Sequence, residues 1–487
     1  MDLDELTPAE RRVWQAFPRG ERVDFGTAAD EDVAEGGSWG PERTVRATVL
    51  RALLLHAPQE AGEIAALKLA GAKITGALDL RYATVDHITR LSTCHFDEVP
   101  DLSGARLRHL NLGGSALPGL RSAHVRIEGA LRLTGCRFGG PLQLTGAQIT
   151  GQLFLDRAQL TSPDEQKPVL RLDQAVLGDD VSAAGLRAHG QVRLDRASVV
   201  GTIDLDDAFL SDPRGTALTA QTLTVGADLR AMRLVAHGLV DLRGARIPGQ
   251  LNLAHAQLSH PGGRALRASS AVIGELWLRE AEPVVGSVNL RRAQVDLLHI
   301  APETWPDRVQ LDGLTYTTLA PHQPAERRLP AVLRDTDGYV PHAYEQLAAA
   351  YRRIGDDHAA RLVQLARQRR HRATLPSYAR LWGYVQDGTV GYGFRPLRAA
   401  VWLLSLLAIG SAVYALHPPR ALKPSEAPHF NPVFYTLDLL LPVISFGQED
   451  AFAPDGWYQG LSYALIITGW ILATTVVTGV TRTVSRQ

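Results

Sequence analysis

Cysteine and methionine are scarce in this 487-residue chain, which has two of each. The two cysteines, Cys94 and Cys136, lie far apart and form no Cys-x-x-Cys pair. This excludes a disulfide framework and a cysteine-rich zinc or iron–sulfur site, and it is typical of a reducing compartment. We expect both thiols to be buried as small apolar side chains.

A net charge is also missing, because 51 basic and 51 acidic residues balance. Nucleic acid is therefore not an expected partner. The first residues contain no apolar run, so we expect neither a secretory signal nor a lipidation site there. No GxGxxG fingerprint, P-loop, HExxH pair or nucleophile elbow occurs, so the sequence predicts no catalytic residue, no cofactor and no metal site.

The first sixty residues carry helical patterns. Thr7 to Glu10 has the form of a capping box, with Pro8 at the first helical position. Residues 41–55 have an apolar stripe that predicts a second helix. We expect residues 1–60 to form a helical cap, because the next segment would otherwise expose strand edges.

Residues 61–318 repeat a short alternating pattern in which apolar residues lie two positions apart, as in Gly129 to Leu133. Alternation of this kind is the periodicity of a β-strand. Glycine recurs eleven residues apart at Gly129, Gly140 and Gly151. Polar inserts that begin at Thr161, Ser211 and Ser259 follow a longer period. The fold class predicted is mainly β, a β-helix solenoid of about eleven coils of about 22 residues each.

Residues 319–394 are expected to hold a Pro-containing linker and a basic helical hairpin. The apolar stripe of residues 342–372 is interrupted at Gly355, and either Asp356 or Asp357 is placed to cap the second helix.

Residues 395–487 carry two long uncharged stretches, at about 399–416 and 460–480, which predict a C-terminal two-helix transmembrane domain. Arginines flank the outer ends of both stretches, and the connecting loop is mostly acidic. By the positive-inside rule, both termini and the solenoid are expected in the cytoplasm of a bacterium, at its inner membrane.

The segment at about 432–447 lies between the two predicted spans and is apolar but broken by proline and glycine. It is either a re-entrant pore-loop-like segment or an amphipathic helix on the outer membrane surface. A carboxylate at mid-membrane costs about 2.5–3.5 kcal/mol, which makes an acidic residue here a functional candidate. The candidate residues are Asp438, Pro442, Ser445, Gly447, Gln448 and Glu449.

Two further sets of residues are candidates for contacts in the membrane. Arginines near the first span are expected either to contact anionic lipid headgroups or only to set the topology; they are Arg367, Arg369, Arg370, Arg372, Arg395 and Arg398. Small residues of the second span are expected to form a helix-association face, namely Gly469, Thr475 and Gly479.

The basic hairpin, the turn at 391–396 and the segment at 435–449 together resemble a family of actinobacterial membrane proteins. These proteins combine a pentapeptide-repeat-like or bactofilin-like β-solenoid with a two-span domain. They often carry the label "membrane-associated oxidoreductase", although no redox motif is present in this chain.

Three functions remain open from the sequence. The first is a membrane-anchored interaction, scaffold or sensor solenoid, with a protein partner or ligand on its face and a homo-oligomeric membrane domain. The second is an ion channel gated by the solenoid, with Asp438 and Glu449 lining the pathway. The third is a membrane-associated oxidoreductase, which the resemblance alone implies.

Overall fold

The computed structural model describes residues 5–26, 31–56, 62–164, 167–376, 396–423, 427–441 and 445–484. For residues 396–400 and 473–484 it describes the backbone alone. The chain divides into two compact units, Met1–Gln346 and Leu347–Gln487. Each unit is described by itself below.

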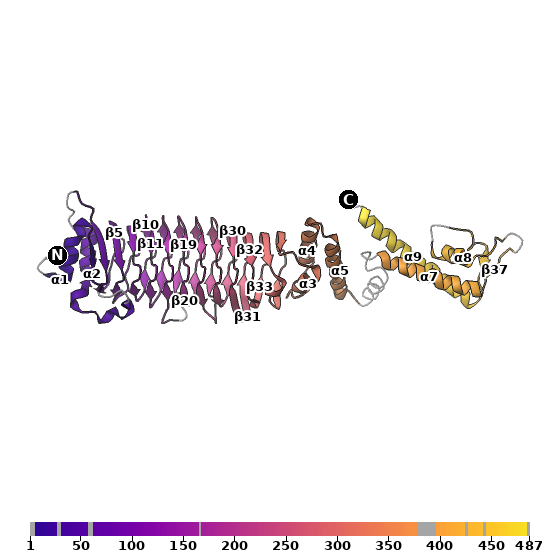
Figure 1. The fold of residues 1–487 in the computed structure, drawn as a ribbon, viewed down its shortest axis with the longest axis horizontal. Coiled ribbons are helices and arrows are strands. Elements are labelled where there is room, and N and C mark those ends of the chain that lie inside the picture. The colour runs from indigo at the N-terminus through magenta and orange to yellow at the C-terminus, as the bar shows by residue number, and fades with distance from the viewer. Residues whose placement is uncertain are drawn as a thin grey trace. The chain divides into compact units, whose positions relative to one another are not determined.

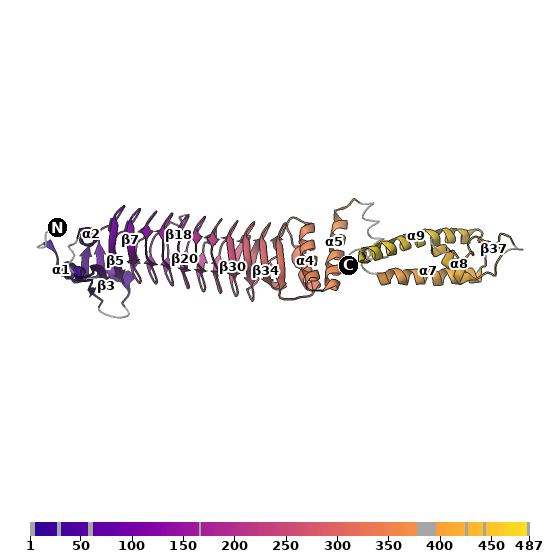
Figure 2. The same cartoon turned by 90° about the horizontal axis from the view of Figure 1, so that it is seen from above.

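The first unit is a parallel β-solenoid of about 12 turns, close to the eleven that the repeat predicts (Figure 1). Among the described residues its strands form two 18-stranded sheets, in which every pairing is parallel. Figure 2 shows the coils stacked along one axis.

The first sheet, sheet A, consists of β1 (Arg22–Asp24), β3 (Ala66–Ala70), β5 (Thr84–Ser92), β7 (Arg106–Asn111), β10 (Arg126–Ile127), β11 (Leu131–Arg132), β14 (Gln148–Ile149), β15 (Leu153–Phe154), β18 (Val176–Leu177), β19 (Val181–Ser182), β22 (Ser198–Val199), β23 (Ile203–Asp204), β26 (Thr224–Val225), β27 (Leu229–Arg230), β30 (Arg246–Asn252), β32 (Val272–Leu278), β34 (Gln294–Ile300) and β36 (Thr315–Ala320).

The second sheet, sheet B, consists of β2 (Thr44–Arg46), β4 (Lys73–Thr75), β6 (His95–Phe96), β8 (Ala116–Leu117), β9 (Leu120–Arg121), β12 (Arg137–Phe138), β13 (Leu142–Gln143), β16 (Gln159–Leu160), β17 (Leu170–Arg171), β20 (Arg187–His189), β21 (Val192–Arg193), β24 (Phe209–Ser211), β25 (Leu218–Thr219), β28 (Val235–His237), β29 (Val240–Asp241), β31 (Gln257–Arg267), β33 (Val285–Asn289) and β35 (Arg308–Gln310).

Aliphatic side chains stack on one another from coil to coil and fill the interior. Ile127 pairs in register with Ile149, which pairs with Leu177, and Leu131 pairs with Leu153. All five are at most 1% exposed. Burying one such side chain stabilises a fold by about 1.5–3 kcal/mol, so each coil gains its stability from the coils on either side.

Tight turns join the faces of each coil, and many place a residue in the left-handed region. Gly146 has φ +64°, as glycine readily allows, but His124 and Arg157 adopt φ +56° and +54° in equivalent turns. In the Arg157 turn the Ala158 N–H donates to the Leu155 carbonyl, and the Arg157 N–H donates to Ala184 in the next coil. Coil stacking therefore holds a backbone conformation that costs a non-glycine residue about 1–2 kcal/mol.

The N-terminal end of the solenoid is covered by α1 (Pro8–Ala16) and α2 (Ala47–His56). The capping box at α1 is confirmed, because Thr7 and Glu10 exchange their two side chain–backbone hydrogen bonds. The predicted helix over 41–55 is wrong in its first half. Residues 41–43 form a 3₁₀ turn, η4, and residues 44–46 form β2, which pairs with β4 and so belongs to the first coil.

Glu10 fastens α1 to that first coil. Its carboxylate accepts hydrogen bonds from the Arg46 Nε (2.7 Å), the Arg46 Nη2 (2.8 Å) and the Arg46 backbone N–H (3.0 Å). Burial raises the pKa of Glu10, but these hydrogen bonds and the one from Thr7 outweigh it and lower the pKa to about 2.

The C-terminal end of the solenoid is covered by α3 (Ala325–Leu333), which lies where the sequence predicts only a linker. Arg328 of α3 is buried and donates to the Ile300 carbonyl of β34 (3.3 Å). The Asp335 carboxylate accepts the Leu311 N–H (2.9 Å), which closes the last coil. Both ends are therefore shielded against edge-to-edge pairing.

The second unit contains most of α4 (Pro341–Arg353) and all of α5 (Asp357–Thr374), α7 (Pro396–Leu416), α8 (Pro432–Leu440) and α9 (Trp457–Val484), with a short ribbon of β37 (Arg420–Ala421) and β38 (Phe452–Ala453). Of the two predicted cap candidates, Asp356 caps α5, because its carboxylate accepts the Ala359 N–H (2.9 Å).

The helices α7, α8 and α9 share a small core of Tyr414, Tyr435, Leu439, Leu440, Phe452 and Leu465. The rings of Tyr414 and Tyr435 meet edge to face, with centroids 4.9 Å apart. The Tyr414 hydroxyl donates to the Tyr458 carbonyl (3.1 Å), which ties α7 to α9.

Candidate functional site

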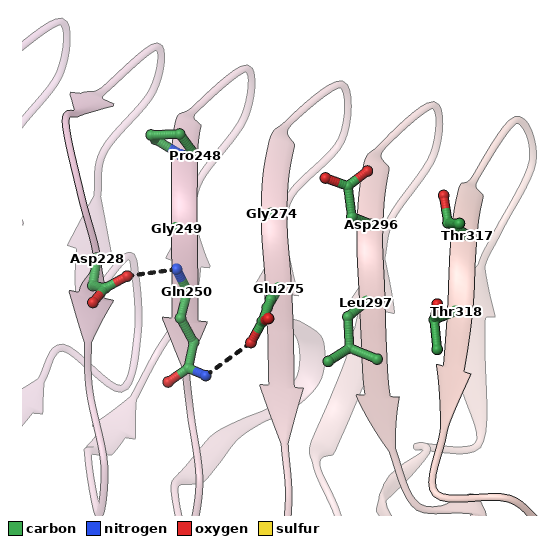
Figure 3. A pocket seen from close by; sticks show the side chains of 10 residues that line it. All are labelled: Asp228, Pro248, Gly249, Gln250, Gly274, Glu275, Asp296, Leu297, Thr317 and Thr318. Carbon is green, nitrogen blue, oxygen red and sulfur yellow. Dashed lines mark hydrogen bonds between the residues drawn. The ribbon is translucent and has the colours of Figure 1, made fainter.

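An open groove of about 590 Å³ runs across sheet A near the C-terminal end of the solenoid (Figure 3). It crosses successive coils, from the start of β27 through β30, β32 and β34 to β36. Its lining residues are Asp228, Pro248, Gly249, Gln250, Gly274, Glu275, Asp296, Leu297, Thr317 and Thr318.

Two glycines leave the floor of this groove bare. A Cβ atom at Gly274 would lie 2.2 Å from the Pro248 carbonyl oxygen, and one at Gly249 would lie 2.2 Å from Asp228 Oδ1. Both distances are far shorter than a van der Waals contact. Because no other residue fits these positions without a shift, the backbone itself forms the floor.

The polar groups of the groove are ordered from coil to coil. The Asp228 carboxylate accepts the Gln250 N–H (2.7 Å), and the Gln250 side-chain amide donates to Glu275 (3.2 Å), as Figure 3 shows. Trp277 Nε1 also donates to Glu275 (2.9 Å). The carboxylates are thus fixed in place before any ligand arrives, and Asp296 adds a third that is exposed.

A stacked pair of rings on β32 and β34 flanks the acidic lining. Trp277 and His299 are register partners, and their centroids are 4.7 Å apart. Burial, followed by the charges of Arg279 and Arg328, lowers the pKa of His299 below its ordinary value. The imidazole is therefore neutral at neutral pH and adds no positive charge to the groove.

The groove can accept hydrogen bonds from a ligand and can bind a positively charged group. Its lining contains three carboxylates and two threonines but neither lysine nor arginine. In the described part of the chain, no group of three His, Cys, Asp or Glu residues is arranged to hold a metal ion. The sequence did not single out these residues, since acidic and glycine positions recur throughout the repeat.

The cysteines are buried, as expected. Burial raises the pKa of both Cys94 and Cys136 to about 12, so neither is a thiolate at neutral pH.

In the second unit, Asp438 of α8 is 5% exposed and holds the following loop. Its carboxylate accepts backbone N–H groups of Phe446 (2.5 Å), Gln448 (2.8 Å) and Glu449 (3.2 Å). Three backbone donors to one carboxylate are a strong structural anchor.

The other residues of the 432–447 candidate segment lie around this anchor. The Gln448 side chain accepts the Asn431 N–H (3.1 Å) and donates to the His429 carbonyl (3.2 Å). The Ser445 hydroxyl accepts the Gly447 N–H (3.2 Å). Burial and the nearby Asp450 and Asp438 raise the pKa of Glu449. Pro442 lies outside the described residues.

Arg367, Arg369, Arg370 and Arg372 all belong to α5, where Arg369 is exposed and the other three are half-buried. Arg367 donates to the Gln364 side chain (3.3 Å). Arg395 and the side chain of Arg398 lie outside the description.

Gly469, a residue of the predicted helix-association face on α9, packs against α8 of the same chain. A Cβ atom there would lie 2.3 Å from the Leu440 carbonyl oxygen of α8. Gly410 of α7 meets α8 in the same way, 2.4 Å from the Thr436 methyl group. The two glycines thus let α8 pack against both longer helices. For Thr475 and Gly479 the structure describes the backbone alone.

Within the described residues, no helix combines the length and the apolar character that a membrane crossing needs. The predicted spans at 399–416 and 460–480 therefore remain predictions.

Comparison with known proteins gives no match: no family model, no curated protein and no solved structure is similar to this chain.

Proposed function

We propose that the chain is an interaction protein whose solenoid docks a positively charged segment of a partner in the sheet A groove. The observation that carries this proposal is the groove lining, in which three carboxylates cross several coils, two of them fixed by hydrogen bonds, and which contains neither lysine nor arginine. Neighbouring coils lie about 4.8 Å apart, so Asp228 and Asp296, three coils apart, are separated by about 15 Å. An extended basic peptide spans that distance in about five residues.

A titration with a hexalysine peptide tests this proposal. We expect saturable binding to the full chain that is weakened at least fivefold in Glu275→Gln combined with Asp296→Asn, because two acceptors of positive charge are lost. The control is Asp179→Asn, at an exposed acidic position outside the groove lining. Equal binding by all three proteins would contradict the groove as the docking site.

The second unit is proposed to hold the solenoid at a lipid bilayer. Large apolar side chains point outward from its helices, among them Leu404 (65% exposed), Ile467 (60%) and Trp457 (80%). A helix that is apolar on all sides is typical of a buried or membrane environment. With the arginine bias of the sequence, this supports a cytoplasmic solenoid at a bacterial inner membrane.

Asp438 favours the anchor over the ion channel. Its two carboxylate oxygens already accept three backbone N–H groups, which leaves little capacity for a passing cation. The proposal retains the pentapeptide-repeat-like assignment, supported by coils such as β10–β13 that have four two-residue strands. It also retains self-association of the second unit, for which Thr475 and Gly479 are the argument from the sequence, because Gly469 already packs against α8 within the chain.

A further inference from the structure

Sheet A, which carries the acidic groove near the C-terminal end of the solenoid, has a basic row of residues near the N-terminal end. Lys68 of β3 pairs in register with Arg90 of β5, and Arg90 pairs with Asn111 of β7. Asn111 pairs in turn with Arg132 of β11. We name these four positions the basic strip. Arg90 is exposed, Lys68 and Arg132 are half-buried, and Asn111 is buried.

The positive charges of the basic strip are not neutralised within the chain. Lys68, Arg90 and Arg132 form no ion pair with any residue that the structure describes. The guanidinium of Arg132 instead lies 3.9 Å from the centroid of the next ring in its row, that of Phe154. By contrast, Arg230 lies further along the same row and pairs with Asp206 (2.8 Å). The basic strip therefore has the charge opposite to that of the groove and is free to meet it.

The basic strip and the groove have the same spacing, in opposite directions along the solenoid. Each has a charge at a first coil, at the second coil beyond it and at the third. Counted toward the N-terminus, the charges of the strip are Arg132, Arg90 and Lys68. Counted toward the C-terminus, the charges of the groove are Asp228, Glu275 and Asp296. At the coil that carries no charge, both have an amide, Asn111 in the strip and Gln250 in the groove.

Two copies packed with their sheet A surfaces face to face would match these charges in one orientation. If the two-fold axis ran along the solenoid, each coil would face its own counterpart and like charges would meet. If the axis instead crosses the solenoid at β19, the basic strip of each copy faces the groove of the other, because β19 lies two coils from both β11 and β27. A two-fold interface repeats each contact, so both matches form together.

The dimensions of sheet A suit such a pairing. The basic strip lies two residues further along the strands than Glu275, a distance of about 7 Å, and a crossing angle of about 20° compensates for it four coils from the axis. Packed sheets commonly cross at about 30°. With strands of up to seven residues, such as β32, the overlap covers about 1,100 Å² of each copy, against about 800 Å² in an ordinary stable interface.

We propose that the sheet A groove of one copy receives the basic strip of a second copy, so that two chains pair antiparallel through their solenoids. Arg90 meets Glu275, and Lys68 meets Asp296. This inference rests on the proposed function, because the same carboxylates accept the positive charge, and it names the partner as the chain itself. Complementary charges fix the partner and the orientation of such an interface.

Zero-length carbodiimide crosslinking of isotope-labelled and unlabelled full chains, mixed at low ionic strength, tests the pairing. We expect mass spectrometry to find a crosslink between Lys68 of one isotopic form and Asp296 of the other. Within one copy these residues lie ten coils apart, about 48 Å, so a single chain cannot form it. The yield should fall as salt screens the charges.

Charge reversal at the other matched pair supplies variants that leave the crosslinked residues unaltered. Arg90→Glu alone and Glu275→Arg alone should each lower the yield of the Lys68–Asp296 crosslink at least tenfold, because like charges then meet at both contacts. An equimolar mixture of the two variants should restore the crosslink between them, because both contacts again join opposite charges. The control is Arg121→Glu, at an exposed arginine of sheet B, which should crosslink as the unaltered chain does.

Hexalysine binding separates a failure of this inference from a failure of the proposed function. Arg90→Glu leaves the groove intact and should bind the peptide at least as tightly as the unaltered chain. Peptide binding without a crosslink between copies would overturn the pairing and leave the groove as a site for another basic partner. The pairing is also overturned if Arg90→Glu crosslinks like the unaltered chain, or if the mixed variants, shown to be folded by circular dichroism, fail to restore the crosslink.

Discussion

The solenoid and the C-terminal helical unit differ in the side chains that point outward. In the solenoid, apolar residues point inward from nearly every strand and polar residues point outward, with exposed exceptions such as Val176 that occur singly. In the C-terminal unit, Tyr414 and Leu465 belong to a buried core. Leu404 and Ile467 are also apolar, but they point outward and are exposed. The first surface therefore suits water and polar partners, whereas the exposed apolar side chains of the second are what the proposed bilayer anchor would bury.

The largest expected difference between the two units is in the free energy of unfolding when an inward and an outward leucine are each replaced by alanine. We expect Leu153→Ala to lower the free energy of unfolding by about 2–5 kcal/mol, because it leaves a cavity between two coils. Leu404→Ala should change it by no more than about 0.5 kcal/mol in detergent, because that side chain faces outward. Guanidinium unfolding followed by circular dichroism measures both. Similar losses in the two variants would contradict the assignment of inside and outside.

The next largest effect is expected at the N-terminal end of the solenoid, where the Glu10 carboxylate joins α1 to the first coil. Glu10→Gln should cost about 3 kcal/mol of local stability at neutral pH, since the folded pKa of Glu10 is about 2 against an ordinary 4.5. A lowered pKa stabilises the fold above about pH 4.5, and that contribution is lost as the pH falls toward 2.

Hydrogen exchange of α1 between pH 7 and pH 3 measures this effect. The unaltered chain should lose protection across that interval, and Glu10→Gln should show low protection throughout. An α1 that exchanges equally in both proteins at pH 7 would remove Glu10 as the fastening group.

Two glycines of α9, Gly469 and Gly460, differ in whether a Cβ atom would meet a neighbour, so their alanine variants can be compared directly. Gly469→Ala should destabilise the packing of α8 by about 1–3 kcal/mol, because its Cβ would meet the Leu440 carbonyl. Gly460→Ala has open space and should instead stabilise the helix by about 0.5–1 kcal/mol. Thermal unfolding in detergent compares the two, and a stabilising Gly469→Ala would show that α8 does not pack there.

The smallest expected effect concerns the strained turns of the solenoid. Arg157→Gly should raise the stability by about 0.5–1 kcal/mol, because glycine adopts φ +54° without a steric penalty. Arg137→Gly, in the extended strand β12, should lower it. Denaturant midpoints of the two variants should therefore move in opposite directions, and a shift of both downward would mean that the Arg157 turn is unstrained.

Much of the solenoid follows from its sequence, because strand alternation at Gly129 to Leu133 and the eleven-residue glycine spacing both repeat many times. The capping box at Thr7 was also predictable, and the cap of α5 was predictable to within Asp356 or Asp357, since each rests on a local hydrogen bond. The strand at position 45 was not predictable, because Val45 belongs to a strand only through its register partner Ile74 in the next coil.

The groove was hidden from sequence reasoning for a related reason. Asp228, Glu275 and Asp296 are far apart along the chain and meet only through coil stacking, and the repeat contains many similar acids. Asp438 was found by its polarity in an apolar segment, but the three N–H groups that it holds could not be predicted.

Flotation of the full chain with liposomes of anionic and zwitterionic lipid tests most directly that the two units face different environments. The account predicts that the chain floats with the vesicles, and that Leu404→Glu combined with Ile467→Glu lowers the bound fraction at least tenfold. Val176→Glu, at an exposed apolar position of the solenoid, should leave flotation unchanged. A chain that stays with the soluble fraction, or a double variant that floats like the unaltered chain, would contradict it.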